Sequence, residues 1–318
     1  MKHIFIINPI AGKQDATTEI TDKLKEFDGK IDYEIYVTKC QGDATTYIKQ
    51  WCTANPDTNV RFYACGGDGT INEVVSGIVG FKNAEMSCYP SGSGNDFVKY
   101  YGGKDGFLNL QSIINGTPHQ VDLMKVRDRY SLNVCNFGFD AMVAKTMIKV
   151  KRKPIIGGPK SSYTYGIIKA LFTSRRNPIK VKVDGEPLNN GDLMLCTLSN
   201  GRYVGGSFIC GPMSLNDDGL IDVSLIAPIS IIKFATMIKA YSNGTYLEDP
   251  KFKKITTYKR GKVVEMSSDS KFAISIDGEI MEDTYFKVEI IDKMSKWYEV
   301  LLEEGKQGWI AKSTLEEI

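Results

Sequence analysis

The stretch "ACGGDGTINEVVSGI" (Ala64–Ile78) joins a buried strand to a helix through a glycine-rich turn. It continues the apolar run "VRFYAC" (60–65), which ends at two glycines. The apolar residues after the turn have the spacing of one helical face, at Ile71, Val74, Val75 and Ile78. Thr70 and Glu73 fit the T-x-x-E capping-box pattern, and Gly80 stands where the helix should end. The stretch therefore predicts a strand–loop–helix unit.

The first third of the chain repeats this pattern. Strands are predicted at 3–8, 33–38, 60–65 and 85–90, and helices at 17–28, 43–54 and 71–79. Strands separated by helices at this spacing predict βαβ units and a parallel sheet. In such open sheets ligands bind beyond the carboxyl ends of the strands. All four predicted strands end in polar loops that contain Gly or Asx, with the sequences "NPIAGK", "TKCQGD", "GGDGT" and "SGSGND".

Strand-like runs dominate the chain after about Val121. They lie at 130–137, 179–185, 193–200, 220–227, 262–268, 272–279 and 286–291. Helical patterns are fewer, at 163–174 and 230–241. This pattern of many strands and few helices predicts a second, mostly antiparallel β domain. We therefore expect an α/β fold with an N-terminal parallel-sheet domain (1–121), a C-terminal β-rich domain (122–292) and a tail (293–318).

The composition narrows the function classes. With 42% apolar and 25% charged residues in a chain of 318, an ordinary soluble protein is expected. The net charge of only +2 does not indicate a protein that binds nucleic acid. The seven cysteines include no C-x-x-C pair, which indicates reduced thiols in a cytosolic protein. With only two histidines, acid–base chemistry falls to carboxylates. No signal peptide or membrane span is expected, because the N-terminus reads as a strand and charges and Pro228 interrupt the apolar stretch Leu220–Ile238.

Asp68 stands at the centre of the first glycine loop. The N–H groups at a helix N-terminus attract anions, and glycines let the backbone approach phosphate oxygens closely. Asp68 itself repels a phosphate unless Mg²⁺ and its water shell lie between them. The loop therefore favours a nucleoside triphosphate with its metal, while a tight turn without a ligand is the alternative.

The second loop, "YPSGSGNDF" (89–97), has the same character. It offers hydroxyl donors, flexible glycines and then an amide and a carboxylate, at Ser91, Gly92, Ser93, Gly94, Asn95 and Asp96. Read alone, it is equally well a flexible turn with an Asx cap. Two such loops at neighbouring strand ends favour a shared phosphate site. Asp122 is a candidate third carboxylate, or a solvated or capping residue at a strand start.

Two further acidic turns lie in the second half of the chain. "FAISIDGEIM" (272–281) presents Asp277 and Glu279 at the end of a strand, but D-G is also a common hairpin turn. The same tripeptide D-G-E recurs in "KVDGEPL" (182–188), where we expect an ordinary turn. In "SLNDDGLIDV" (214–223), Asp218 and backbone carbonyls would hold a divalent cation, or the segment is only a hairpin. Both interpretations remain open from the residues alone.

A family resemblance joins these segments. "NPIAGK" (8–13), "GGDGTINEVVSGI" (66–78), "PSGSGNDF" (90–97), "VDLMKV" (121–126), "NGRYVGGSF…P" (200–212), "LNDDGLIDV" (215–223) and "SIDGE" (275–279) occur in this order. Together they resemble the diacylglycerol kinase and sphingosine kinase type of lipid kinase, most closely its small soluble bacterial members. The resemblance runs from residue 4 to about 290. G-G-D-G-T alone is also shared with NAD kinases.

The resemblance implies a nucleotide-binding α/β domain and a β-sandwich-like domain, with ATP and Mg²⁺ bound and catalysis in the cleft. Asp68, Asp96 and Asp122 would form a water-bridged Mg²⁺–ATP network. The nucleotide site would be lined by Asn8, Gly12, Lys13, Thr38, Gly66, Gly67, Gly69 and Thr70. Asp277 would be the base for the lipid hydroxyl, with Glu279 beside it. Asp218 would hold a structural Mg²⁺ with the carbonyls of Leu215 and Leu220.

The expected reaction is transfer of the ATP γ-phosphoryl group to the primary hydroxyl of diacylglycerol, giving phosphatidic acid. Sphingoid bases, ceramide and other lipid alcohols are alternative acceptors, and an NAD kinase or a catalytically silent nucleotide-binding regulator are alternative functions. We expect a cytoplasmic protein that contacts the membrane surface transiently through basic residues in 149–160 and at Arg175–Arg176, unless these are only a solvated charged loop. A homodimer is left open. The tail resembles the latter part of an SH3-like module or a strand that returns to the first domain.

Overall fold

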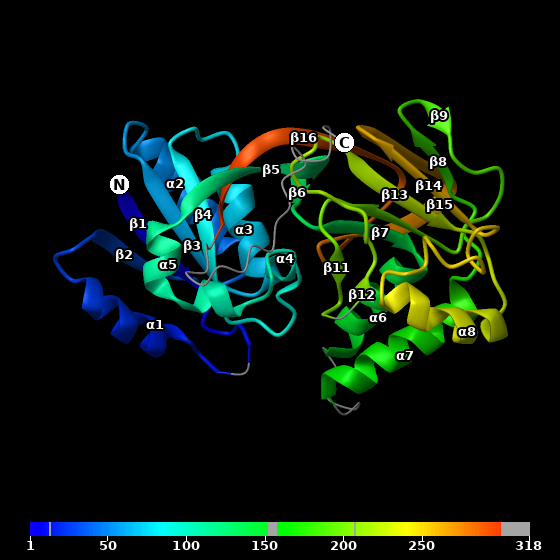
Figure 1. Cartoon of the computed structure of the whole chain (residues 1–318), viewed down its shortest axis with the longest axis horizontal. Coiled ribbons are helices and arrows are strands. Elements are labelled where there is room, and N and C mark those ends of the chain that lie inside the picture. Colours follow the sequence, from blue (N-terminus) through cyan, green and yellow to red (C-terminus); the bar gives the residue numbers. More distant parts are fainter. Residues whose placement is uncertain (13, 152–157, 207, 300–318) are drawn as a thin grey trace, which may run out of the picture. The chain divides into compact units, whose positions relative to one another are not determined.

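The computed structural model describes residues 1–12, 14–151, 158–206 and 208–299. The chain divides into two compact units. Among the described residues, unit 1 comprises Met1–His119 with Lys296–Glu299, and unit 2 comprises Gln120–Ser295. Figure 1 shows a sheet with helices in each of them. Each unit is described by itself.

Unit 1 is built on a parallel sheet with the strand order β2-β1-β3-β4. Its strands are β1 (Lys2–Ile7), β2 (Asp32–Val37), β3 (Val60–Gly66) and β4 (Ala84–Pro90). β3 and β4 are buried along their whole length, as expected for central and covered strands of a parallel sheet. Ile7 lies opposite both Val37 and Cys65, so the strands end at one edge of the sheet. This confirms the predicted parallel α/β fold.

The helices of unit 1 follow the predicted alternation. They are α1 (Thr17–Leu24), η1 (Lys25–Phe27), α2 (Asp43–Ala54), α3 (Asp68–Ile78), α4 (Asp96–Lys99), η2 (Asp105–Leu108) and α5 (Leu110–Asn115). α3 packs on β3 and β4 and against α2. A Cβ on Gly77 would lie 2.8 Å from the Cβ of Ile48, so this glycine permits the close packing of α3 on α2. The three elements after β4 were not predicted, because each is too short to show a helical period.

The start of α3 differs from the prediction. The helix begins at Asp68, its N-cap residue is Gly67, and no side chain caps it. Thr70 Oγ1 instead accepts a hydrogen bond from Asn8 Nδ2 at 3.0 Å. Glu73 Oε1 accepts one from the backbone N–H of Gly42 at 2.9 Å. The predicted capping box is therefore wrong, since tertiary partners have taken both side chains.

Unit 2 is built on a ten-stranded sheet within the described residues. The order is β14-β13-β10-β7-β15-β16-β5-β6, and β8 joins at β15 with β9 beyond it. The bounds are β5 (Thr117–Val126), β6 (Arg129–Ser131), β7 (Val134–Gly138), β8 (Lys180–Val183), β9 (Glu186–Pro187), β10 (Leu195–Ser199), β13 (Ile221–Ile226), β14 (Thr256–Gly261), β15 (Val263–Ile276) and β16 (Glu279–Glu299). A separate hairpin contains β11 (Tyr203–Val204) and β12 (Phe208–Ile209). The ladders whose registers are resolved are antiparallel, as the sequence predicted.

Three predicted strands of unit 2 have different boundaries. The run 130–137 is divided between β6 and β7. The runs 262–268 and 272–279 belong to the single strand β15, whose pairing with β16 shifts register between Ser267 and Phe272. A local bulge of this kind looks like a turn in the sequence, although the strand continues through it.

The described part of unit 2 also contains three helices: α6 (Phe139–Lys151), α7 (Gly158–Thr173) and α8 (Ile231–Ser242). α7 and α8 were predicted. α6 was missed, although Phe139, Met142, Val143 and Met147 have helical spacing. Buried side chains two residues apart on β7, β10 and β13 form one apolar cluster, and the helices pack around a second cluster that includes Phe139, Met237 and Tyr241. Within the described residues, no helix is both long and apolar enough to cross a membrane.

Candidate active site

The loops that follow the four parallel strands are bonded to one another at one edge of the unit 1 sheet. The backbone N–H of Thr38 donates to Ile7 O at 2.8 Å, and that of Asn8 donates to Cys65 O at 3.0 Å. The N–H of Ser91 donates to Gly66 O at 2.9 Å. The structure thus brings together the strand ends at which the sequence placed the nucleotide site. Lys13, also predicted there, lies outside the described residues.

Most glycines of these loops are explained by contacts within the chain. A Cβ on Gly92 would lie 2.4 Å from the Cα of Gly67, so the two glycine loops pack backbone against backbone. A Cβ on Gly12 would lie 2.1 Å from Ser91 O, and Gly12 has a φ of +78°. Any side chain at these positions would force the loops apart.

Gly69 is different. It lies in the first turn of α3, its φ is not in the left-handed region, and a Cβ built on it would meet nothing within 4 Å. Glycine costs roughly 0.5–1 kcal/mol relative to alanine inside a helix. Nothing in the described part of the chain therefore requires glycine here, and its absent side chain leaves room at a helix N-terminus, where anions bind favourably.

Asp68 and Asp96 both lie close to Gly94. A Cβ on Gly94 would be 2.8 Å from Asp68 Oδ2 and 3.9 Å from Asp96 Oδ2. Asp68 Oδ1 accepts a hydrogen bond from the backbone N–H of Phe97 at 3.3 Å, which links the start of α3 to that of α4. Asp96 is buried and forms an ion pair with Lys99 at 2.7 Å. Two of the three predicted metal-network carboxylates are thus neighbours in unit 1.

The second glycine loop also holds polar atoms that the described chain leaves unsatisfied. Ser91 Oγ and Asn95 Oδ1 are buried, and neither has a hydrogen-bond partner in the described part of the chain. Native proteins rarely leave such atoms unpaired, so they suit a bound polar ligand. Among the described residues, no group of three or more His, Cys, Asp or Glu side chains is arranged to hold a metal directly. Two carboxylates fit a Mg²⁺ ion that keeps most of its water ligands.

Asp122, the third predicted carboxylate, lies on β5 in unit 2 and is fully buried. Its Oδ2 accepts a hydrogen bond from the N–H of Gly219 at 2.7 Å, and its own N–H donates to Asn216 O at 2.7 Å. Asp122 therefore fixes the loop 214–220. Its predicted part in a Mg²⁺–ATP network stays a prediction.

Asp277 lies in the turn between β15 and β16. Ile276 pairs with Glu279, while Asp277 (φ 45°) and Gly278 (φ 93°) form the two-residue connection typical of a hairpin. Its carboxylate accepts hydrogen bonds from four donors: Ser131 Oγ at 2.8 Å, Leu132 N at 2.8 Å, Asn133 N at 3.2 Å and Val134 N at 2.9 Å. These bonds explain why β6 and β7 are separate strands, because the N–H groups between them turn toward Asp277. They also hold the carboxylate in one orientation.

Glu279, the predicted neighbour of Asp277, forms an ion pair with Arg129 at 2.8 Å. Both side chains are 42% exposed, so the pair is worth at most about 1 kcal/mol. Arg129 was not among the predicted site residues. Only the pairing of distant segments brings it to Glu279.

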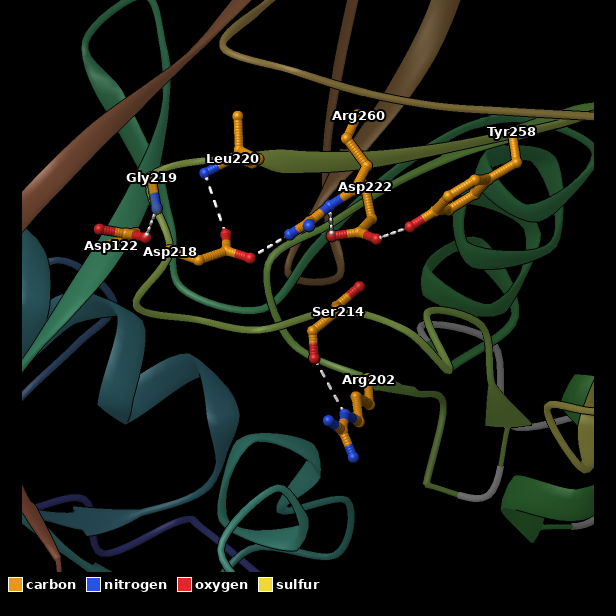
Figure 2. A network of polar contacts seen from close by, with 9 residues as sticks. All are labelled: Asp122, Arg202, Ser214, Asp218, Gly219, Leu220, Asp222, Tyr258 and Arg260. Carbon is orange, nitrogen blue, oxygen red and sulfur yellow. Dashed lines mark hydrogen bonds and ion pairs between the residues drawn. The ribbon is translucent and has the colours of Figure 1, made fainter. Parts of the chain in front are cut away.

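Asp218 belongs to a polar network that Figure 2 shows. Its Oδ2 is paired with Arg260, and its Oδ1 accepts a hydrogen bond from the N–H of Leu220 at 3.1 Å. Arg260 also faces the buried carboxylate of Asp222, with Nε 3.5 Å from Oδ2, and Tyr258 donates to Asp222 Oδ1. Burial raises the pKa of Asp222 above its usual value. The sequence analysis missed Arg260 and Tyr258, which the strand register alone brings to Asp222.

A second titratable residue of unit 2 was also missed. Asp140, in the first turn of α6, accepts a hydrogen bond from Tyr241 at 3.2 Å. The residue as a whole is partly exposed, but its carboxyl is withdrawn from solvent, and this burial raises its pKa to about 6. Because burial disfavours the charged form, this carboxyl favours the protonated form near neutral pH more than an ordinary aspartate does.

Family models match most of the chain. The diacylglycerol kinase catalytic domain matches residues 2–126. The YegS C-terminal NAD kinase beta sandwich-like domain matches residues 133–294. The two models therefore follow one another along the chain in the order that the sequence motifs predicted.

Curated relatives include a diacylglycerol kinase of Bacillus subtilis (strain 168), 26% identical over 86% of this chain and 88% of that protein. A diacylglycerol kinase of Staphylococcus aureus (strain MRSA252) is 28% identical over 86% of this chain and 84% of that protein. Both alignments span most of the two domains, so the similarity is not limited to one loop.

Solved structures share the fold. A diacylglycerol kinase of Bacillus anthracis str. Sterne has a TM-score of 0.68 at 21% identity, covering 94% of this chain and 98% of that chain. An NAD kinase from Archaeoglobus fulgidus in complex with ATP has a TM-score of 0.51 at 11% identity, covering 94% of each chain. At these identities the structures show the fold alone. The family models and the curated relatives place the chain in the diacylglycerol kinase family.

Proposed function

We propose that this protein is an ATP-dependent lipid kinase that phosphorylates the primary hydroxyl of diacylglycerol to give phosphatidic acid. One observation carries the proposal: the carboxylates of Asp68 and Asp96 both lie close to Gly94 at a glycine-rich edge of the parallel sheet. In a member of the diacylglycerol kinase family, this edge suits a nucleoside triphosphate approached through a hydrated metal. The curated relatives that carry the name diacylglycerol kinase support the choice of acceptor.

Nucleotide binding is assigned to unit 1. The first turn of α3 and the backbone of residues 93–95 would provide N–H groups for phosphate oxygens, and Gly69 leaves room for these oxygens. The N–H groups of Ser91 and Gly92 already donate to Gly66 O. Asp68 and Asp96 would hold Mg²⁺ through its water ligands. When bound, the ion neutralises part of the charge on the phosphates.

Asp277 is assigned as the base that accepts the proton of the acceptor hydroxyl. In the transfer, a bond forms between the hydroxyl oxygen and the γ-phosphorus, and the bond from that phosphorus to the bridging oxygen of ADP breaks. Phosphoryl transfer depends mainly on positioning and charge stabilisation, so a base that accepts the proton late suffices. The four hydrogen bonds to Asp277 supply the positioning, because they hold its carboxylate in one orientation.

A transient contact with the membrane surface is part of the proposal. α7 carries Tyr165, Ile168 and Phe172 at a spacing of three and four residues, and Phe172 is 74% exposed. Such spacing places the three side chains on one stripe of the helix. Lys169, Arg175 and Arg176 lie in or just after the same helix. Apolar side chains enter the interface, and each basic residue near an anionic surface contributes about 1 kcal/mol.

The test is a direct assay of the full chain with labelled ATP, Mg²⁺ and separate acceptors in mixed micelles: diacylglycerol, ceramide, sphingosine and soluble NAD. We expect label in phosphatidic acid and little in the other products. Label mainly in a sphingolipid would keep the lipid kinase and change its acceptor. Label mainly in NADP would favour the NAD kinase function that the Archaeoglobus fulgidus fold makes worth testing. ATP binding without transfer to any acceptor would indicate a silent nucleotide-binding regulator.

A further inference from the structure

The carboxylate of Asp218 is already engaged on both oxygens by groups of the chain. Oδ2 pairs with the guanidinium of Arg260, and Oδ1 accepts the N–H of Leu220 at 3.1 Å (Figure 2). The Asp218 side chain is only 14% exposed. The family resemblance expects a divalent cation here, held by Asp218 with the carbonyls of Leu215 and Leu220. In this chain a cationic side chain is paired with the carboxylate that the metal would need.

The position of Arg260 follows from the sheet. β13 and β14 are antiparallel, and Arg260 lies directly opposite Asp222. Tyr258, two residues earlier on the same face of β14, donates to Asp222 Oδ1. The guanidinium therefore reaches Asp218 with one nitrogen while its Nε stays 3.5 Å from Asp222 Oδ2. Arg260 thus forms ion pairs with two carboxylates, an arrangement that the forked guanidinium suits.

Other protein groups also bind this loop, at positions that Arg260 does not contact. Asp122 accepts from the N–H of Gly219 and donates its own N–H to Asn216 O, each at 2.7 Å. Arg202 Nε donates to Ser214 O at 2.9 Å. Both ends of the segment 214–220 are thus fixed by side chains, and the order of the loop does not call for a bound ion.

We propose that the guanidinium of Arg260 takes the place of the structural divalent cation in unit 2. A Mg²⁺ or Ca²⁺ ion at Asp218 would have to displace this guanidinium or lie next to it, and two cations in a partly buried position repel. The folded state of this chain therefore does not depend on a divalent cation at Asp218. This inference is separate from the kinase activity, and its test uses neither nucleotide nor lipid.

The experiment measures the thermal unfolding midpoint, Tm, of the full chain in EDTA and in increasing Mg²⁺ or Ca²⁺. Three proteins are compared with wild type: Arg260→Gln, Arg260→Lys, and Lys254→Gln, which removes one charge from an exposed residue of the preceding loop. Arg260→Gln is expected to be less stable in EDTA and to regain a few degrees of Tm with the cation, because the two carboxylates then accept a metal. Arg260→Lys and Lys254→Gln are expected to respond to cations as wild type does.

Asp218→Asn in the wild-type background keeps the test decisive if Arg260→Gln does not fold. We expect any change of Tm with Mg²⁺ or Ca²⁺ to be the same in wild type and in Asp218→Asn, because no ion binds at that carboxylate. A cation-dependent rise in the Tm of wild type that disappears in Asp218→Asn would overturn the proposal. A folded Arg260→Gln protein whose Tm does not change with either cation would also overturn it. The loop would then bind no cation even without Arg260, so Arg260 could not be said to replace one.

Discussion

Asp184 and Asp277 occupy the same position in two hairpin turns with the same sequence, D-G-E. Their φ values are 50° and 45°, and the glycines that follow have φ values of 84° and 93°. Each carboxylate also bonds to the backbone of a neighbouring segment. Asp184 Oδ1 accepts the N–H groups of Lys262 and Val263, each at 2.9 Å, whereas Asp277 accepts four donors from 131–134. The tripeptide sets the turn, and the surroundings give each aspartate its role.

Asp277→Asn is expected to reduce kcat at least about 100-fold if Asp277 is the base, the usual size of a general-base contribution. The amide cannot take the hydroxyl proton, and its NH₂ group would face an N–H donor, so a loss of stability of about 1–3 kcal/mol is also expected. The measurement is kcat and KM for diacylglycerol, together with Tm and the affinity for Mg²⁺–ATP.

Asp184→Asn is the matched control for this prediction, because it changes the same position in the other D-G-E turn. It should lower Tm by a similar amount and leave kcat within about twofold of wild type. If Asp277→Asn lowers kcat no more than Asp184→Asn does at the same loss of Tm, Asp277 is a structural residue and not the base.

Gly69→Ala should weaken nucleotide binding without harming the fold. Its Cβ would meet no atom of the described residues within 4 Å, and alanine stabilises a helix by roughly 0.5–1 kcal/mol relative to glycine. We expect an unchanged or higher Tm with affinity for Mg²⁺–ATP reduced at least about tenfold, read by isothermal titration calorimetry. Gly92→Ala is the contrast, because its Cβ would lie 2.4 Å from the Cα of Gly67 and should lower Tm. Unchanged affinity in Gly69→Ala would remove the argument that this glycine makes room for phosphate.

Asp68→Asn should separate the metal from the nucleotide. The substitution keeps an acceptor for the N–H of Phe97, which Asp68 Oδ1 now bonds at 3.3 Å, so the fold should be retained. It removes the negative charge that would hold hydrated Mg²⁺. Affinity for Mg²⁺–ATP should fall at least about tenfold, while affinity for ATP in EDTA should stay equal or rise, because phosphate no longer meets a carboxylate. Equal losses with and without Mg²⁺ would contradict the metal-bridged arrangement.

Asp140 should make part of the stability depend on pH. Its folded pKa, about 6, lies above the ordinary value of 3.8, so the stability it contributes is present below about pH 4 and is lost as pH rises to about 6. The shift of about two units corresponds to at most about 3 kcal/mol. Asp140→Asn should therefore gain stability relative to wild type between pH 4 and 6, with a constant difference above that range, as measured by urea denaturation.

His3 titrates over the same range with the opposite sign. Burial, with the nearby charge of Arg61, lowers its pKa from 6.5 to about 4, so its contribution to stability falls as pH drops through this window. The Asp140→Asn comparison cancels this effect, because both proteins retain His3. A difference between the two proteins that is constant from pH 4 to 7 would contradict the prediction for Asp140.

The exposed stripe of α7 should govern binding to anionic vesicles. Replacing Ile168 and Phe172 by serine removes the two most exposed of its three apolar side chains, and we expect vesicle co-sedimentation to fall severalfold with Tm unchanged. Met213→Ser, at a residue that is 57% exposed outside α7, serves as the control. Binding should also decrease with salt, because basic residues contribute to it. Vesicle binding that changes neither with the α7 substitutions nor with salt would rule out this surface as the membrane contact.

The sequence by itself determined the local architecture. Hydrophobic periodicity and the Gly- and Asx-rich loops specified the parallel sheet of unit 1 and the adjacency of Asp68 and Asp96, because parallel strands all end at one edge. It also specified both D-G-E turns, since a two-residue hairpin requires residues that tolerate a positive φ. These features depend only on neighbours in the chain or on a simple rule of sheet topology.

The tertiary structure alone decided the partners of each polar side chain. Thr70 and Glu73 have a capping-box spacing, yet they bond to Asn8 and Gly42, and Asp218 looks like a metal ligand, yet it pairs with Arg260. Arg260 is 42 residues from Asp218 and reaches it only because β14 lies beside β13 in one register. A carboxylate binds whichever donor or cation the fold brings within reach, and strand register is set by the whole sheet rather than by the residues around that carboxylate.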